Sequence, residues 1–375
     1  MPTELHSNSV LGDGALPFQA IQDMIAGGII TGADSKNVGA GSLDLTMDEE
    51  QYRVVGVFQP RFGERVRELL KDIDALPYHG THFERGVTYI VKAKESLKLP
   101  PSIYAYCNPK SSTGRLDLHV RVIADGEPSY DAMSKRFNGE LWFIINCNSF
   151  PIGIPPGQTL SQVRFFNANT KFSETRMEIS FPKFQLLWGP DGRPFEYEDL
   201  NISDRDGSLI LTLDMAGDEI GLECRGGNTV LDFSARNHYD PSEFFQPVRK
   251  QKNDMITLKQ GCFYLLRTAE WVRVPPELAC EMRPMDPRRG DLRAHYAGFI
   301  DPGWGYGKDG EGKGRSLVLE VRAFESDLIF RAGRGIAKIR FEEMAAVPDV
   351  SYDARGGSHY TSNDHLLSKH FKKRG

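Results

Sequence analysis

The chain has 375 residues, and 46 basic against 51 acidic side chains leave a formal net charge of -5. This length predicts about two domains, and the charge balance excludes a global basic field of the kind that binds nucleic acid or acidic membranes. The five cysteines include no CxxC pair and are expected to be reduced core thiols. Neither a signal peptide nor an apolar run of about 18 residues is present, so we expect a cytoplasmic protein without membrane contact.

Two segments have helical patterns. Residues 16–25 carry apolar side chains at helical spacing and stop at Gly27-Gly28, and residues 59–76 are amphipathic with mixed charge. Most of the remainder predicts short strands, because segments rich in β-branched and aromatic residues alternate with Gly and Pro turns. The expected strands include 89–93, 97–99, 140–146, 209–213, 316–321 and 336–341. We therefore predict a mainly β fold, a β-sandwich or β-barrel in each half, with a few short helices.

One segment of the chain occurs twice. Gly86-Val-Thr-Tyr-Ile-Val-Lys-Ala-Lys-Glu-Ser-Leu-Lys-Leu-Pro-Pro101 returns without a gap as Gly261-Cys-Phe-Tyr-Leu-Leu-Arg-Thr-Ala-Glu-Trp-Val-Arg-Val-Pro-Pro276, with five of sixteen positions identical and an offset of 175. A second echo, 157–165 against 333–341, has an offset of 176. The sequence therefore predicts two copies of one domain, 1–180 and 181–375, with the boundary uncertain by about fifteen residues within a turn-rich stretch.

Three segments match the spacing of known motifs but lack a residue or a structural context that each motif requires. Gly305-Tyr-Gly-Lys-Asp-Gly310 fits GxGxxG, but a strand and not a helix is predicted after it. The overlapping string that ends at Lys313 is followed by Gly314, where a P-loop needs a Ser or Thr, so a glycine-rich hairpin loop is expected. His82-Phe-Glu84 has the HxE spacing of zinc deaminases, but the cysteine pair is missing, so no protein-bound zinc is expected.

The segment Asn108-Pro-Lys-Ser-Ser-Thr-Gly-Arg115 has the composition of an anion site. Lys110 and Arg115 flank the hydroxyls of Ser111 and Ser112, and charge-assisted donors of this kind bind phosphate oxygens. A polar surface turn has the same composition, so both interpretations stay open. At the 175 offset the second half has Arg283-Pro-Met-Asp-Pro-Arg288, which lacks the lysine and both serines. A phosphate cradle is thus expected in the first half only.

The second half has its own distinctive strings. Ala297-Gly-Phe-Ile-Asp-Pro-Gly-Trp304 is a tight turn with an acid, and Ser316-Leu-Val-Leu-Glu320-Val places a glutamate inside an apolar strand. Such a carboxylate lies on an exposed edge, is paired, or is catalytic. The repeat offsets place Ile144 or Ile145 at the corresponding position of the first half, which makes the glutamate specific to one copy. Glu140 lies four or five residues away and stays open as a counterpart, because the sequence does not fix the strand register.

Together, Lys-Ser-Ser-Thr-Gly-Arg-Leu, Ala-Gly-Phe-Ile-Asp-Pro-Gly-Trp and Leu-Val-Leu-Glu resemble the motifs of dCTP deaminases in the trimeric dUTPase-like superfamily. The resemblance covers both halves and implies two tandem dUTPase-like domains of the β-clip type. It implies that Glu320 is the general base, and that the string from Tyr352 to Ser358 is a mobile tail that closes over the triphosphate. The substrate-binding residues that it implies are Lys110, Ser111, Ser112, Arg115, Ala297, Gly298, Asp301, Tyr352 and Arg355.

The chain departs from the family pattern at several places. Lys110 replaces the first arginine of the phosphate motif, and Phe299 stands where an arginine is usual. The loop 305–315 is longer than the family's hairpin, and the first half has Asp125-Gly-Glu-Pro-Ser-Tyr in place of the Ile-Asp-Pro-Gly string. Because family members build each site between neighbouring domains, the resemblance implies a composite site, with phosphate contacts from the first half and chemistry from the second.

The activity that the resemblance implies is hydrolytic deamination of dCTP to dUTP and ammonia without zinc. Glu320 would activate the water that attacks C4 of cytosine, with a pKa brought near the working pH by burial. Mg²⁺ is expected only as the chelate of the triphosphate. A dUTPase, a bifunctional deaminase and dUTPase, and a non-catalytic nucleotide-binding regulator are the alternatives. A modified cytosine nucleotide as substrate, binding of dUTP or dTTP, and a homo-oligomer also stay open.

Overall fold

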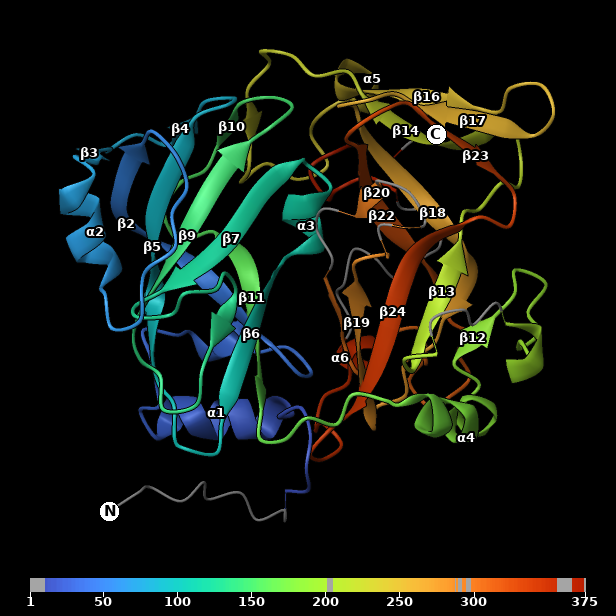
Figure 1. The fold of residues 1–375 in the computed structure, drawn as a ribbon, viewed down its shortest axis with the longest axis horizontal. Helices are drawn as coiled ribbons and strands as arrows, with labels where there is room; N and C mark the ends of the chain where they lie inside the picture. The colour runs from blue at the N-terminus through green and yellow to red at the C-terminus, as the bar shows by residue number, and fades with distance from the viewer. Residues whose placement is uncertain are drawn as a thin grey trace. The chain divides into compact units, whose positions relative to one another are not determined.

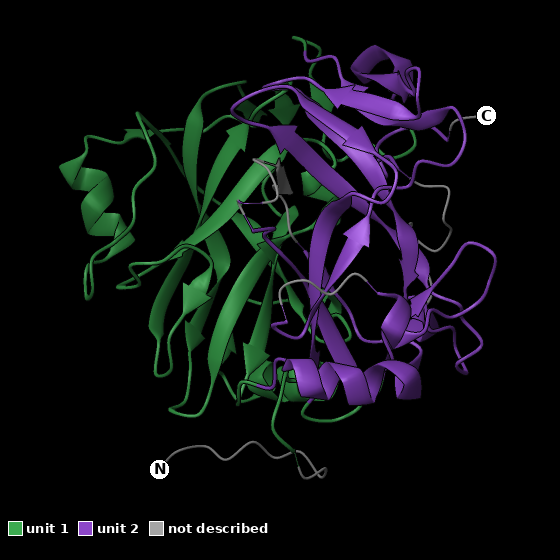
Figure 2. Cartoon of the chain, turned by 45° about the vertical axis from the view of Figure 1, so that its right-hand side comes forward, with its two compact units in different colours: residues 1–169, 227–238, 345–349 green, residues 170–226, 239–344, 350–375 purple. Residues whose placement is uncertain are grey.

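The computed structural model describes residues 11–200, 205–286, 288, 292–294, 298–355 and 366–373. Figure 1 shows the helices and strands, and Figure 2 colours the two compact units that the chain forms. Unit 1 comprises residues 1–169, 227–238 and 345–349, and unit 2 comprises residues 170–226, 239–344 and 350–375. The division after residue 169 precedes the predicted one at 180, and the two short returns of the chain to unit 1 have no counterpart in the prediction. In the described part of the chain, no helix is long and apolar enough to cross a membrane.

Unit 1 is built mainly from one large sheet. Its helical elements are α1 (Phe18–Ala26), η1 (Ser35–Asn37), α2 (Val66–Asp72) and α3 (Ser111–Gly114). Its strands are β1 (Ile30–Thr31), β2 (Leu43–Val54), β3 (Leu76–Pro77), β4 (His82–Phe83), β5 (Thr88–Lys98), β6 (Tyr104–Pro109), β7 (Leu118–Ala124), β8 (Ala132–Met133), β9 (Asn138–Cys147), β10 (Ile152–Gly153), β11 (Thr159–Phe166) and β15 (Leu231–Asp232). The main sheet has the order β7-β9-β5-β2-β11-β6-β8, and β15-β10-β4 form a small second sheet. The first part of β2 pairs with β11 and the rest pairs with β5, so this one strand joins the two halves of the sheet.

Unit 2 divides its strands among three sheets. Its helical elements are α4 (Glu174–Phe184), η2 (Tyr197–Asp199), α5 (Pro241–Phe244) and α6 (Tyr352–Arg355). Its strands are β12 (Leu187–Trp188), β13 (Ser208–Thr212), β14 (Glu219–Cys224), β16 (Phe245–Arg249), β17 (Met255–Leu258), β18 (Phe263–Val272), β19 (Leu278–Arg283), β20 (Leu292–Ala294), β21 (Phe299–Ile300), β22 (Arg315–Ala323), β23 (Leu328–Arg331) and β24 (Gly335–Glu343). The sheet orders are β16-β14-β18-β22-β20, β13-β24-β19-β21 and β17-β23. The predicted mainly β fold with few short helices is confirmed.

The helices differ in part from the prediction. α1 ends where the glycine pair begins, as expected. The helix expected over 59–76 is reduced to α2, because Gly63 (φ 81°) and Asp74 (φ 49°) have left-handed backbone on either side of it. α4 was not predicted, although the hydroxyl of Ser173 caps it by accepting a hydrogen bond from the Arg176 N–H at 3.3 Å. Residue 180, the predicted domain boundary, lies inside this helix.

The internal repeat is a structural repeat. β5 and β18 are the two copies of the first repeated segment, and β11 and β24 are the copies of the second. Ile90 of β5 pairs with Ile144, and Leu265 of β18, 175 residues later, pairs with Glu320. The pairing register therefore selects Ile144, and not Ile145, as the unit 1 counterpart of Glu320.

Identical residues of the repeat have identical structural roles. Gly86 and Gly261 have φ of 76° and 74°, a conformation that glycine adopts without strain. The hydroxyl oxygens of Tyr89 and Tyr264 accept a hydrogen bond from the backbone N–H five residues earlier, at 3.2 and 2.8 Å. Each copy thus uses the same glycine and tyrosine to fix the turn that leads into its strand.

The third shared residue is a buried carboxylate at a β-bulge. Glu95 and Glu270 lie where the register of β5 with β9, and of β18 with β22, shifts. Glu95 accepts a hydrogen bond from the N–H of Thr46 at 2.8 Å, and Glu270 accepts one from the N–H of Thr212 at 2.7 Å. The carboxylates satisfy backbone groups that the bulge leaves without a strand partner, which explains their retention in both copies.

Candidate active site

Glu320 lies in the interior of the six-stranded sheet of unit 2. Its strand β22 pairs with β18 on one side and with β20 on the other (Figure 1). Leu319 and Val321 enter the main hydrophobic core, so Glu320 projects from the opposite face of the sheet. Glu320 is buried, with only 4% of its surface exposed. The position on an exposed strand edge that the sequence left open is therefore excluded.

The turn after β21 is held by backbone hydrogen bonds. Its carboxylate residue, Asp301, is 9% exposed, and the Asp301 carbonyl accepts from the N–H of Trp304 at 3.1 Å. The N–H of Gly303 donates to the Val274 carbonyl at 2.9 Å. The carbonyl of Gly298, on the other side of β21, accepts a hydrogen bond at 3.2 Å from β19. Ala297, the remaining candidate of this string, lies outside the described residues.

α6 packs on this turn. The Tyr352 N–H donates to the Pro302 carbonyl at 2.8 Å, and the Tyr352 ring lies 5.0 Å from the Trp304 ring. The buried Asp353 carboxylate pairs with Arg315 at 2.7 Å. Tyr352 and Arg355, predicted as tail residues, therefore belong to a short helix that is fixed to the turn. Residues 356–365, which include the rest of the predicted tail, lie outside the described residues.

The glycine-rich stretch 305–314 is an ordered loop that leads into β22. The Arg273 guanidinium donates to the carbonyls of Gly310 and Gly312, both at 2.9 Å, and lies 4.3 Å from the Tyr306 ring. The Gly307 N–H donates to the Asp353 carboxylate at 2.9 Å. The strand β22 follows the loop, as the sequence predicted, in the place where a dinucleotide-binding motif needs a helix.

The phosphate-motif candidates surround α3 in unit 1. The Lys110 ammonium pairs with the Asp44 carboxylate and donates to Thr159 Oγ1 at 2.8 Å. Ser111 is exposed, whereas Ser112 and Arg115 are 4% and 5% exposed. The structure thus gathers the four candidates at one short helix, and it also gives the lysine two partners that the sequence did not reveal.

Lys110, Asp44 and Thr159 form a polar cluster that unit 2 lacks at the corresponding positions. Met285 replaces the lysine, and Gly335 occupies the position of the threonine at the 176 offset. A Cβ on Gly335 would lie 2.6 Å from Ile210 Cγ2 and 3.5 Å from Met285 Cε. Ile210 precedes Thr212 as Asp44 precedes Thr46, so it corresponds to the aspartate. At these three positions unit 2 thus has an apolar contact where unit 1 has polar groups, and only the strand pairing reveals this correspondence.

The described residues contain no candidate metal centre. Within them, no three His, Cys, Asp or Glu side chains are grouped so that they could hold a metal ion. Glu84 of the HxE string forms an exposed ion pair with Arg53 at 3.0 Å. The five cysteines are free thiols, four of them buried.

Comparisons with known proteins agree with this architecture. Residues 12–169 match the family model of the 2'-deoxycytidine 5'-triphosphate deaminase N-terminal domain, and residues 196–371 match that of the C-terminal domain. The crystal structure of 2'-deoxycytidine 5'-triphosphate deaminase from Agrobacterium tumefaciens matches with a TM-score of 0.80 and 32% identity, over 90% of this chain and 99% of that chain. The native dUTPase of EIAV matches at 12% identity over 34% of this chain and 88% of that chain, and its TM-score of 0.20 is too low to support a common fold. No curated protein matches.

The two family models cover most of both units, and the Agrobacterium structure is matched over nearly its whole length. This chain therefore belongs to the 2'-deoxycytidine 5'-triphosphate deaminase family, with two tandem domains.

Proposed function

We propose that this chain hydrolyses dCTP to dUTP and ammonia, with Glu320 as the general base. Membership of the deaminase family supports the substrate and the reaction. The observation that carries the role of Glu320 is its burial in a strand interior of unit 2, where the repeat has Ile144 in unit 1. A carboxylate that both copies needed for folding would be retained in both, as Glu95 and Glu270 are.

In this mechanism the Glu320 carboxylate takes a proton from a water molecule as its oxygen attacks C4 of the cytosine ring. As the C4–O bond forms, the π electrons of the C4=N3 bond move to N3. The proton then passes to the exocyclic nitrogen, the C4–N bond breaks to release ammonia, and the remaining hydroxyl proton moves to N3 to give the uracil carbonyl. Proton transfer by a positioned side chain contributes about 10² to 10⁴ in rate. The glutamate supplies the activation that zinc gives other deaminases, so we propose that no protein-bound zinc takes part.

We propose that the Lys110 to Arg115 segment binds the triphosphate, with Mg²⁺ as the nucleotide chelate. Asp44 and Thr159 account for two of the three N–H donors of the Lys110 ammonium. One donor is then left for a phosphate oxygen, and the exposed Ser111 hydroxyl offers another. In this arrangement Asp44 orients the ammonium and neutralises part of its charge.

Product analysis tests this function. The purified chain is incubated with dCTP and Mg²⁺, and dUTP, dUMP, diphosphate and ammonia are resolved, in parallel with zinc-chelated and zinc-supplemented samples. We expect equal amounts of dUTP and ammonia from the zinc-free protein. Diphosphate together with dUMP from dUTP would support a dUTPase or a bifunctional enzyme. Binding of dCTP without any product would refute the enzymatic proposal and support a regulator.

A further inference from the structure

In unit 1, the sheet face that corresponds to the Glu320 face is covered by the chain itself. Trp142 and Ile144 of β9 project from this face and pack against Val66 and Leu70 of α2. They form a hydrophobic cluster in which no member is more than 3% exposed, made of Val66, Leu70, Ile90, Ile123, Trp142 and Ile144. A helix from the 59–76 segment thus seals the place where unit 2 has its buried glutamate.

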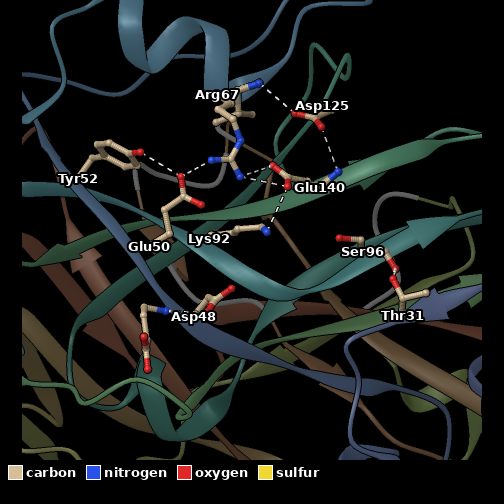
Figure 3. A network of polar contacts seen from close by, with 11 residues as sticks. Thr31, Asp48, Glu50, Tyr52, Arg67, Lys92, Ser96, Asp125 and Glu140 are labelled. Atoms are coloured by element: carbon tan, nitrogen blue, oxygen red, sulfur yellow. Dashed lines mark hydrogen bonds and ion pairs between the residues drawn. The ribbon is translucent and has the colours of Figure 1, made fainter. Parts of the chain in front are cut away.

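A polar network fastens α2 to the sheet, as Figure 3 shows. The Arg67 guanidinium pairs with Glu50 of β2 and, at 3.1 Å, with Glu140 of β9. The same guanidinium lies 5.2 Å from the ring of Trp142, and Lys92 of β5 pairs with Glu140 at 3.1 Å. One helical residue is thereby tied to two strands and to the largest side chain of the cluster beneath it.

The start of α2 also binds the unit 1 turn that replaces the Ile-Asp-Pro-Gly string. The Asp125 carboxylate, 176 residues before Asp301, accepts hydrogen bonds from the N–H groups of Val66 at 3.0 Å and of Glu140 at 3.1 Å. The Gly126 N–H donates to the Glu64 carbonyl at 2.7 Å. The turn and the strand face, which would form a reaction site in this copy, are therefore both engaged by residues 64–70.

We propose that unit 1 has no reaction site of its own, because residues 64–70 fill the place that would receive a nucleobase, and that each chain has a single deamination site. Three changes from unit 2 act together here. The catalytic carboxylate is replaced by Ile144, the acidic turn caps a helix, and that helix closes the face. The count of sites rests on the proposed function, whereas the closure of unit 1 does not.

Thiol labelling tests the closure without any reference to activity. Ile144→Cys and, as an exposed control, Val55→Cys are made in a Cys262→Ser background, since Cys262 is the native thiol that is not buried. We expect Cys-specific reagent to modify the Ile144→Cys protein about 100-fold more slowly than the Val55→Cys protein, because modification requires local opening. Adding Arg67→Ala should speed the labelling. Equal labelling rates for the Ile144→Cys and Val55→Cys proteins would overturn the proposal. If Ile144→Cys does not fold, Leu70→Cys takes its place.

Binding stoichiometry tests the number of sites. Glu320→Gln protein is titrated calorimetrically with dCTP and Mg²⁺, and one nucleotide per chain is expected. Two equivalents per chain would overturn the proposal of a single site. If the wild-type chain neither binds nor converts dCTP, the proposed function fails, while the labelling rates still decide whether unit 1 is closed.

Discussion

Replacing Glu95 by glutamine should make the stability of the protein less dependent on pH. Glu95 is fully buried, and its carboxylate accepts a hydrogen bond from the Thr46 N–H at 2.8 Å. Burial raises the pKa of Glu95 from 4.5 to about 7. A glutamine has nearly the same shape and keeps a carbonyl oxygen for the Thr46 N–H, but it cannot ionise.

The sign follows from the direction of the shift. Since the pKa of Glu95 is higher in the folded than in the unfolded chain, its contribution favours folding fully below the unfolded pKa of about 4.5 and is lost as the pH rises to about 7. A shift of one unit corresponds to about 1.4 kcal/mol, so between pH 5 and pH 8 the wild type should lose about 2 to 3 kcal/mol that the variant keeps.

Urea unfolding at pH 5 and pH 8 measures this difference. The change in unfolding free energy between the two pH values is taken for each protein, and groups common to both cancel in the comparison. Glu270→Gln is the matched variant in unit 2, where burial also raises the pKa of the carboxyl, and it should shift in the same direction. Wild type and Glu95→Gln with pH dependences that agree within about 0.5 kcal/mol would refute the reasoning.

Two further predictions concern stability. Lys110→Met leaves the largely buried Asp44 carboxylate without its ammonium and should destabilise the protein by about 1–3 kcal/mol. The triple variant Lys110→Met, Asp44→Ile and Thr159→Gly copies unit 2, where the glycine leaves room for the isoleucine, and should recover part of the loss in thermal unfolding; additive losses would contradict this. Gly303→Ala adds a Cβ 2.6 Å from Ser351 Cβ at a φ of 90°, while Gly333→Ala has a similar φ of 78° and no atom within 4 Å. The first variant should therefore lose about 1–3 kcal/mol more than the second, and equal losses would show that the contact with Ser351, the residue before α6, does not matter.

The sequence predicted features that depend on local pattern. Gly86 and Gly261 marked the repeat because a left-handed turn selects glycine, and the strands followed from β-branched and aromatic runs between turns. The repeat also placed Ile144 or Ile145 opposite Glu320, with Glu140 still open until the strand pairing was known. The glycines and the strands depend on residues within a few positions of one another, and the repeat depends only on comparing one half of the chain with the other.

Other features required pairing between distant parts of the chain. Asp44 and Lys110 are 66 residues apart, and only the joining of β2 to β11 and β11 to β6 brings them together. The amphipathic pattern of residues 59–76 did not show where the helix ends, because Gly63 and Asp74 change the backbone direction. α4 was missed because Pro182 and the surrounding turn residues resemble a linker, while its Ser173 cap is a weak signal alone.

The most direct test of the central claim is a comparison of Glu320→Gln with the wild type for dCTP turnover and dCTP binding. If Glu320 is the general base, kcat should fall by about 10² to 10⁴ while the dissociation constant for dCTP stays nearly unchanged, because glutamine keeps the shape of the side chain and loses its basicity. Deamination by Glu320→Gln at the wild-type rate would contradict the account.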